Sequence, residues 1–197
     1  MASNTVLPNA RIVSFEPLPD CFEKLKRNMS KAKNFAAFNY GLGDAAGEFP
    51  FERNAFSMSS SFLKMTRVHT TSFPFTAQTQ SIKVRVERLD DIGPSLGLTE
   101  PFLAKIDVQG FEDRVLRGGQ QTLRRAAVMF VEMSFEALYE GQPLFDSICR
   151  QVHDMGFTYK GNLDQIPCPQ SGRVLQANGI FMRTENDRTI ANRVRTG

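Results

Sequence analysis

The stretch PFLAKIDVQGFEDRVLRGG, residues 101–119, contains a strand, an acid, a turn and a helix in that order. Residues 102–106 form a short apolar run typical of a buried strand, and Asp107 stands at its end. Gly110 favours a turn, and the following residues show helical spacing up to the glycines at 118 and 119, which end the helix. This order is typical of one unit of a parallel α/β sheet.

Three other stretches have a similar order. RIVSFEPLPD, residues 11–20, is a strand that ends on Glu16 and is followed by helical spacing. NFAAFNYGLGD, residues 34–44, is a strand followed by a glycine turn and Asp44. AAVMFVEMSF, residues 126–135, is an apolar strand with Glu132 near its end, and an amphipathic helix follows over 143–155.

The repeated units predict an α/β fold with a mostly parallel, doubly wound sheet. Two candidate strands near the end, in 157–161 and 178–184, predict an antiparallel edge. At 197 residues the chain is expected to be a single domain, 1–197, with a leader at 1–10, a core at 11–183 and a flexible tail at 184–197.

Four acids fall at or just past predicted strand ends: Glu16, Asp44, Asp107 and Glu132. In a parallel sheet, ligands bind outside the carboxyl ends of the strands, and an acid on the second strand accepts hydrogen bonds from the ribose hydroxyls of a nucleotide cofactor. A solvated surface acid explains any one of these residues equally well. Four on one edge of the sheet favour a ligand site.

The composition indicates the compartment of the protein and the kinds of partner that it does not bind. Three cysteines, odd in number and far apart, favour reduced thiols in a cytoplasm. No apolar run approaches the length of a membrane span, and the first residues lack the pattern of a signal peptide. The net charge is +3, and the basic residues near the end have no interleaved aromatic residues. We therefore expect a cytoplasmic protein that binds neither membrane nor nucleic acid.

The chain resembles the FkbM-type methyltransferase family over about residues 11–183. The matching stretches are FEPLPDCFEKLKRN, NYGLGDAAGEFPF, SMSSSF, VRVERLDDI, KIDVQGFEDRVLRGG, VEMSFEALYEGQPLF and GIFMR, in the family's order. KIDVQGFE followed by VLRGG is the most specific of them. The resemblance implies a Rossmann-like class I methyltransferase fold that uses S-adenosylmethionine and methylates a hydroxyl of a small metabolite or glycan.

The resemblance also implies roles for individual residues. Glu16 would hold the ribose of the cofactor, and the turn of Leu42, Gly43 and Asp44 would lie beside the adenine. Asp107 would face the methionine end or the acceptor. Gln109 and Asn178 stand where an acid is expected in the family's pattern.

The family's first strand and its glycine-rich turn have no counterpart in MASNTVLPNA, which precedes the strand that ends on Glu16. In the family's fold, the first strand would lie between the strands that end on Glu16 and Asp107. We therefore expect a sheet that lacks its central strand, which leaves backbone groups without partners and favours self-association.

Methyl transfer to oxygen is an in-line displacement, which gains from orientation and from a group that takes the hydroxyl proton. Asp107, Glu132 and His69 are the candidates for that base, and no metal is required. His69 lies in a long connection, 53–80, that could form a lid. The serines of SMSSSF, residues 57–62, are either a flexible turn or a substrate contact.

The function that the sequence predicts is S-adenosylmethionine-dependent O-methylation. One alternative is a truncated or catalytically inactive methyltransferase-like domain retained for binding, favoured by the lack of the glycine-rich turn. The other is a nicotinamide-dependent oxidoreductase, which also has an acid on its second strand. The chain contains neither the Gly-x-Gly-x-x-Gly turn nor the Tyr-x-x-x-Lys pair expected of such an enzyme.

Overall fold

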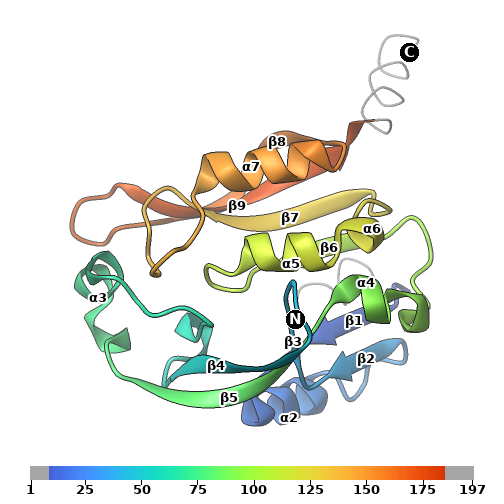
Figure 1. The fold of residues 1–197 in the computed structure, drawn as a ribbon, viewed down its shortest axis with the longest axis horizontal. Coiled ribbons are helices and arrows are strands. Elements are labelled where there is room, and N and C mark those ends of the chain that lie inside the picture. Colours follow the sequence, from blue (N-terminus) through green and yellow to red (C-terminus); the bar gives the residue numbers. More distant parts are fainter. Residues whose placement is uncertain (1–8, 185–197) are drawn as a thin grey trace.

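A computed structural model describes residues 9–184 as a mixed α/β fold with its strands in three sheets (Figure 1). Almost all of the expected leader, 1–10, and of the expected tail, 184–197, lies outside the described residues.

The first sheet contains the strand that ends at Glu16. β1 (Ile12–Phe15) pairs in parallel with β2 (Phe35–Phe38), and α2 (Pro19–Asn28) connects them. Pro19 is suited to the first turn of α2, because that position needs no backbone N–H donor.

The second sheet is a long curved ribbon with a short third strand. β4 (Gly47–Asn54) and β5 (Thr79–Glu87) are antiparallel, and β3 (Gly41–Leu42) runs parallel to β5. The connection between β4 and β5 holds η1 (Ser57–Ser59), α3 (Arg67–Ser72) and η2 (Pro74–Thr76). The expected long loop therefore has three short helical turns.

The third sheet has the order β6-β7-β9-β8. β6 (Leu103–Ile106) is parallel to β7 (Val128–Ser134). β9 (Val174–Arg183) is antiparallel to both β7 and β8 (Phe157–Pro167), which confirms the predicted antiparallel edge. The helices before and between these strands are α4 (Leu89–Ile92), η3 (Gly93–Leu96), α5 (Glu112–Gly118), α6 (Gln120–Leu123) and α7 (Phe145–Asp154).

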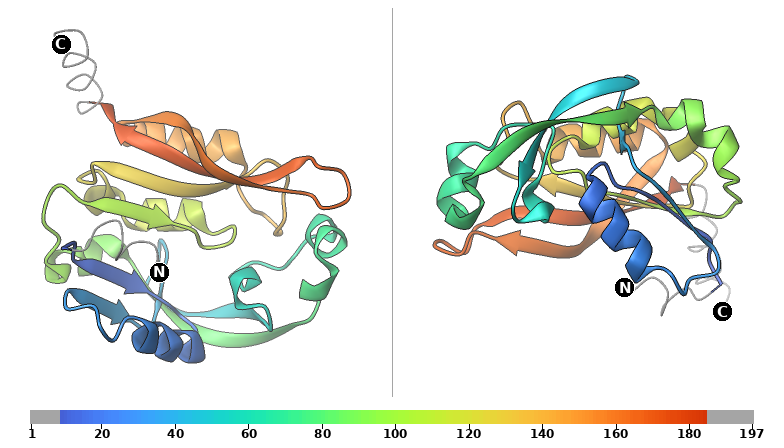
Figure 2. Two further views of the ribbon diagram at one scale, coloured as in Figure 1. Left: turned by 180° about the vertical axis from the view of Figure 1, so that it is seen from behind. Right: turned by 90° about the horizontal axis from the view of Figure 1, so that it is seen from below.

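The main core lies between this third sheet and the helices α5 and α7, which cover one of its faces (Figure 2). Met129, Val131 and Met133 point from β7 into this core. Because side chains alternate along a strand, Phe130, Glu132 and Ser134 lie on the opposite face of β7. The buried Glu132 is therefore separated from the apolar core.

The prediction of one mostly parallel sheet is wrong in this structure. The strands form three sheets, and antiparallel pairs are as frequent as parallel ones among residues 9–184. The physical reason is a lack of pairing at two places in the described chain: β1 does not pair with β6, and neither β1 nor β2 pairs with the sheet of β3, β5 and β4. Because no strand of residues 9–184 joins β1 to β6, the two parallel pairs lie in separate sheets.

Over residues 9–184, no helix combines the length and the apolar character needed to cross a membrane.

Candidate active site

The loop between β6 and α5 has a tightly fixed backbone. Gln109 has a φ of 55°, the only positive φ of a non-glycine residue in the described chain, and Gly110 follows with a φ of 95°. The buried carboxyl group of Glu112 accepts hydrogen bonds from the backbone N–H groups of Val108 (3.0 Å) and Gly110 (3.2 Å). Such strained positions often occur at functional sites, and here the strain orients the side chain of Gln109.

The amide of Gln109 links two of the predicted acids. Its Nε2 donates to Oδ1 of Asp107 (3.0 Å) and to Oε2 of Glu132 (2.8 Å). Asp107 also accepts from Nζ of Lys105 at 2.9 Å, and its side chain is 29% exposed. Asp107 therefore faces solvent with its orientation fixed from two sides.

Glu132 is only 3% exposed, and its Oε2 accepts a second hydrogen bond, from Nε2 of Gln176 (3.0 Å). Burial, followed by the nearby charges of Asp107 and Glu112, raises the pKa of Glu132 well above its ordinary value. The two acids thus have different surroundings, because Asp107 is open to solvent and Glu132 is enclosed by amides.

Tyr139 completes the hydrogen bonding of Gln109. Its buried hydroxyl donates to Oε1 of Gln109 at 2.9 Å. Nε2 of His69 lies 3.5 Å from the same hydroxyl, and Nδ1 of His69 lies 3.1 Å from the hydroxyl of Thr76. His69 is 3% exposed, and burial lowers its pKa. The structure places His69 behind Tyr139, with no direct contact to Asp107 or Glu132.

Three serines of SMSSSF, Ser59, Ser60 and Ser61, are buried near this loop, whereas Ser57 is exposed. Oγ of Ser61 donates to the backbone carbonyl of Gln109 at 2.6 Å, and Oγ of Ser60 accepts from the backbone N–H of Asn54 at 2.9 Å. Ser59, Ser60 and Ser61 are each less than 9% exposed. Ser60 and Ser61 thus hold the backbone of the connection and of the loop after β6, while both interpretations of SMSSSF stay predictions.

Glu16 stands at the carboxyl end of β1, as predicted. Its Oε1 accepts from the backbone N–H of Leu18 at 2.8 Å, and no other contact of its carboxyl group is found within residues 9–184. Burial raises the pKa of Glu16, partly offset by the hydrogen bond from Leu18. One carboxylate oxygen thus accepts from the turn, and the other has no partner within residues 9–184.

The turn of Leu42, Gly43 and Asp44 packs against α5. Asp44 lies within 3.5 Å of both Arg114 and Arg117, and their charges outweigh its burial and lower its pKa. A hollow of about 250 Å³ adjoins this turn, lined by Gly43, Asp44, Ala45, Phe49, Val86, Phe111 and Arg114. Asp44 is therefore committed to two arginines at the edge of this hollow.

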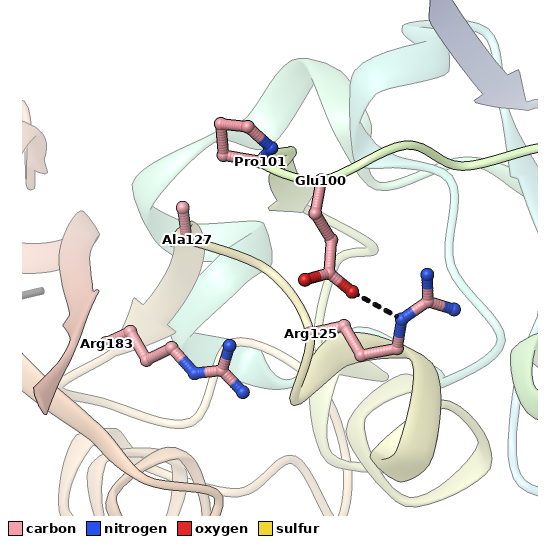
Figure 3. Close-up of a pocket in the computed structure, with 5 residues that line it drawn as sticks. All are labelled: Glu100, Pro101, Arg125, Ala127 and Arg183. Atoms are coloured by element: carbon pink, nitrogen blue, oxygen red, sulfur yellow. Dashed lines mark hydrogen bonds and ion pairs between the residues drawn. The ribbon is translucent and has the colours of Figure 1, made fainter. Parts of the chain in front are cut away.

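A slightly larger hollow, about 290 Å³, lies at the opposite ends of the strands (Figure 3). It adjoins the starts of β6 and β7, where the Glu100–Arg125 ion pair of 2.8 Å and Arg183 line it. Ligands in α/β sheets bind at the carboxyl ends of strands, so we do not assign a site to this hollow.

Of the predicted site residues, the structure brings Asp107 and Glu132 together through Gln109. It links His69 to them only through Tyr139, and it gives Glu16 and Asp44 separate partners. Sequence reasoning missed the roles of Gln109, Tyr139 and Gln176. Gln109 stands where the family's pattern has an acid, and this was the one signal in the sequence for its role. An amide can donate to two carboxylates, whereas a third acid at this position would repel them.

The fold and the site thus define an α/β domain with paired acids at neighbouring strand ends. A sequence model of the Methyltransferase FkbM domain matches residues 2–159. The chain therefore belongs to the FkbM methyltransferase domain family, which confirms the resemblance.

The names of two relatives state either the oxygen that is methylated or the acceptor molecule. The chain is 29% identical to a 2-O-methyltransferase, NoeI, of Sinorhizobium fredii, over 68% of this chain and 58% of that protein. It is 26% identical to a hexuronic acid methyltransferase, AglP, of Haloferax volcanii, over 63% of this chain and 47% of that protein. The chain thus spans about half the length of the curated relatives it matches. No solved structure matches it significantly.

Proposed function

We propose that this protein is an S-adenosylmethionine-dependent O-methyltransferase whose acceptor is a hydroxyl of a sugar or glycan. The observation that carries the proposal is the paired-acid site, in which Lys105 and Gln109 fix the exposed carboxylate of Asp107 beside the buried Glu132. Family membership supports methyl transfer. The name of NoeI, a 2-O-methyltransferase, supports transfer to an oxygen, and the name of AglP, a hexuronic acid methyltransferase, supports a sugar acceptor.

Residues present in the chain fit the donor in part. Glu16 offers a carboxylate oxygen at the end of β1, which suits the hydroxyls of a ribose. The turn of Leu42, Gly43 and Asp44, with its hollow, suits an adenine ring. When bound, the donor supplies a methyl group on a sulfonium centre. The proposal includes a Rossmann-like arrangement in which β1 and β6 present Glu16 and Asp107 to the same ligand.

In this proposal Asp107 accepts the proton of the acceptor hydroxyl, because it is the exposed acid of the pair. Lys105 and Gln109 hold its carboxylate, so that its orientation does not need to be fixed again when the acceptor binds. His69 is assigned to the support of Tyr139, since it has no direct contact with either acid.

A catalytically inactive binding domain is the second candidate, and the unpaired edges of β1 and β6 favour it. Two unpaired edges do not hold Glu16 and Asp107 in one fixed geometry, which methyl transfer requires. The family match favours both candidates over a nicotinamide-dependent oxidoreductase.

The test is to incubate the full chain with methyl-labelled S-adenosylmethionine and a panel of acceptors. The panel contains uronic acid glycosides, neutral oligosaccharides and a deoxy sugar that lacks the hydroxyl next to the anomeric carbon. Label in a glycoside, and none with Asp107→Asn, supports the proposal. Donor binding by calorimetry without transfer to any acceptor supports the inactive binding domain, and neither binding nor transfer contradicts both.

A further inference from the structure

The side chain of Asn178 on β9 has a buried hydrogen-bond acceptor that lacks a donor. Oδ1 of Asn178 is buried and has no hydrogen-bond partner among residues 9–184. The amide cannot be turned over to remove this, because its Nδ2 donates to Oδ1 of Asp164 at 2.7 Å. Buried polar atoms in proteins nearly always have partners, so the orphaned oxygen calls for a donor nearby.

Glu132 is the cross-strand neighbour of Asn178. The two residues are paired in the antiparallel register of β7 and β9, which places their side chains next to each other on the same face of the sheet. That face is opposite to the one covered by α5 and α7, so apolar core residues do not separate them.

The hydrogen bonds of Glu132 leave one oxygen unused. Its Oε2 accepts from both Gln109 and Gln176, whereas Oε1 has no partner within the described chain. An ionised carboxylate can only accept hydrogen bonds, but a protonated one has an O–H donor. A proton on Oε1 of Glu132 supplies the donor that Asn178 lacks.

We propose that Glu132 is a neutral carboxylic acid that donates from Oε1 to Oδ1 of Asn178, and that it acts as a positioning residue for Asp107 through Gln109. Oε1 of Glu132 and Oδ1 of Asn178 then each have a hydrogen-bond partner. The proton inference stands on the contacts alone, while the positioning of a catalytic base rests on the proposed function.

The charges around Glu132 agree with a neutral acid. Asp107 faces it with like charge, Glu112 adds to this effect in its ionised form, Lys105 on β6 opposes them, and the buried hydroxyl of Tyr139 lies beyond Gln109. Lys105 is committed to Asp107 by its 2.9 Å contact. Burial and the charge of Asp107 together outweigh the charge of the exposed Lys105.

A neutral Glu132 has a different role from Asp107, the other candidate for the base. A neutral Glu132 does not take up the proton of an acceptor hydroxyl, because its acceptor oxygen is already shared by two amides. Asp107 keeps that task. Glu132 instead fixes the amide of Gln109, whose other hydrogen bond orients Asp107.

The experiment is infrared spectroscopy of the full chain at neutral pH, with glutamate labelled in its carboxyl carbon. We expect a carbonyl band of a protonated carboxylic acid that disappears in Glu132→Gln and shifts to higher frequency in Asn178→Leu, which removes the acceptor. Glu112→Gln is the matched control, because Glu112 is a second buried acid whose band must be assigned separately.

Thermal melting supplies a second readout. The Glu132→Gln side chain still accepts from two amides and donates to Asn178, so it should melt within about 2 °C of the parent, whereas Glu132→Ala should lose at least about 5 °C. If the band assigned to Glu132 is missing, if it does not respond to Asn178→Leu, or if Glu132→Gln fails to fold, the inference is overturned. None of these outcomes depends on methyl transfer, so they are distinct from a failure of the proposed function.

Discussion

Gly118 packs directly on the carbonyl group of Gly43, and a β-carbon at position 118 would lie 1.8 Å from that carbonyl oxygen. This contact joins α5, which follows the acid Asp107, to the turn that precedes Asp44. It gives the VLRGG motif a physical reason, because only a residue without a side chain allows the helix this close to the turn.

We expect Gly118→Ala to destabilise the fold by about 1 to 3 kcal/mol, the usual cost of overpacking, and to lower the melting temperature by about 3 to 10 °C. Arg117→Ala is the control, because it removes only an exposed ion pair with Asp44 and Asp113, worth less than about 1 kcal/mol each. Equal melting temperatures for Gly118→Ala and the parent would show that the turn can move away.

Glu16→Ala should weaken the binding of S-adenosylmethionine by roughly 1.5 to 3 kcal/mol, which is about 10-fold to 150-fold, since two ribose hydroxyls lose a charged acceptor. Calorimetric titration measures this. Glu16→Gln keeps an oxygen for the backbone N–H of Leu18 and should lose less affinity. An Ala variant that binds the donor as tightly as the parent rules out the ribose assignment.

Asp107→Asn should lower kcat by at least about 100-fold, the usual contribution of a general base, and leave the melting temperature close to that of the parent. The substitution keeps the shape and one acceptor oxygen for Gln109 or Lys105. Asp113→Asn, an acid on α5 that pairs with Arg117, is the matched control and should keep its turnover. Full activity of Asp107→Asn speaks against this residue as the base.

The stability of the protein should fall as pH rises from about 4.5 to about 7, because burial raises the pKa of Glu112 from 4.5 to about 7. In this range the unfolded chain releases the proton of Glu112 while the folded chain keeps it, so each step in pH favours unfolding, by roughly 3 kcal/mol in total.

Denaturant unfolding at pH 5 and pH 8 checks this expectation. Glu112→Gln keeps an oxygen for Val108 and Gly110 and removes the titration, so its advantage over the parent should appear at pH 8 and vanish at pH 5. Glu100→Gln, at an exposed ion pair, should keep the parent's pH dependence. A Glu112→Gln variant with the same pH slope as the parent contradicts the assignment.

The chain should self-associate with rising concentration, because β1 and β6 each present an unpaired edge within residues 9–184. Light scattering measures the size. Leu103 on β6 is 46% exposed, and Leu103→Lys should shift the equilibrium toward the monomer. Met58→Lys, at a residue 67% exposed in η1, is the control and should change nothing. A parent that stays monomeric at all concentrations shows that these edges are covered.

The sequence alone predicted the elements that carry the acids. The strand before Asp107, the strand before Glu16 and the amphipathic helix at 143–155 are all found, because apolar runs and helical spacing act within a few residues. It also predicted the antiparallel pair near the end. These features depend on local backbone preference and on burial of one face.

Only the tertiary structure determined how those elements meet. Gln109 reaches Glu132 across 23 residues and Ser61 reaches the backbone of Gln109 across 48, so no local pattern reveals either contact. The three sheets of residues 9–184 likewise depend on which strand lies alongside which, because neither β1 with β6 nor β2 with β3 forms a pair there. The sequence thus determined which residues stand at strand ends, whereas long-range packing decided that an amide joins two of them and that His69 is buried behind Tyr139.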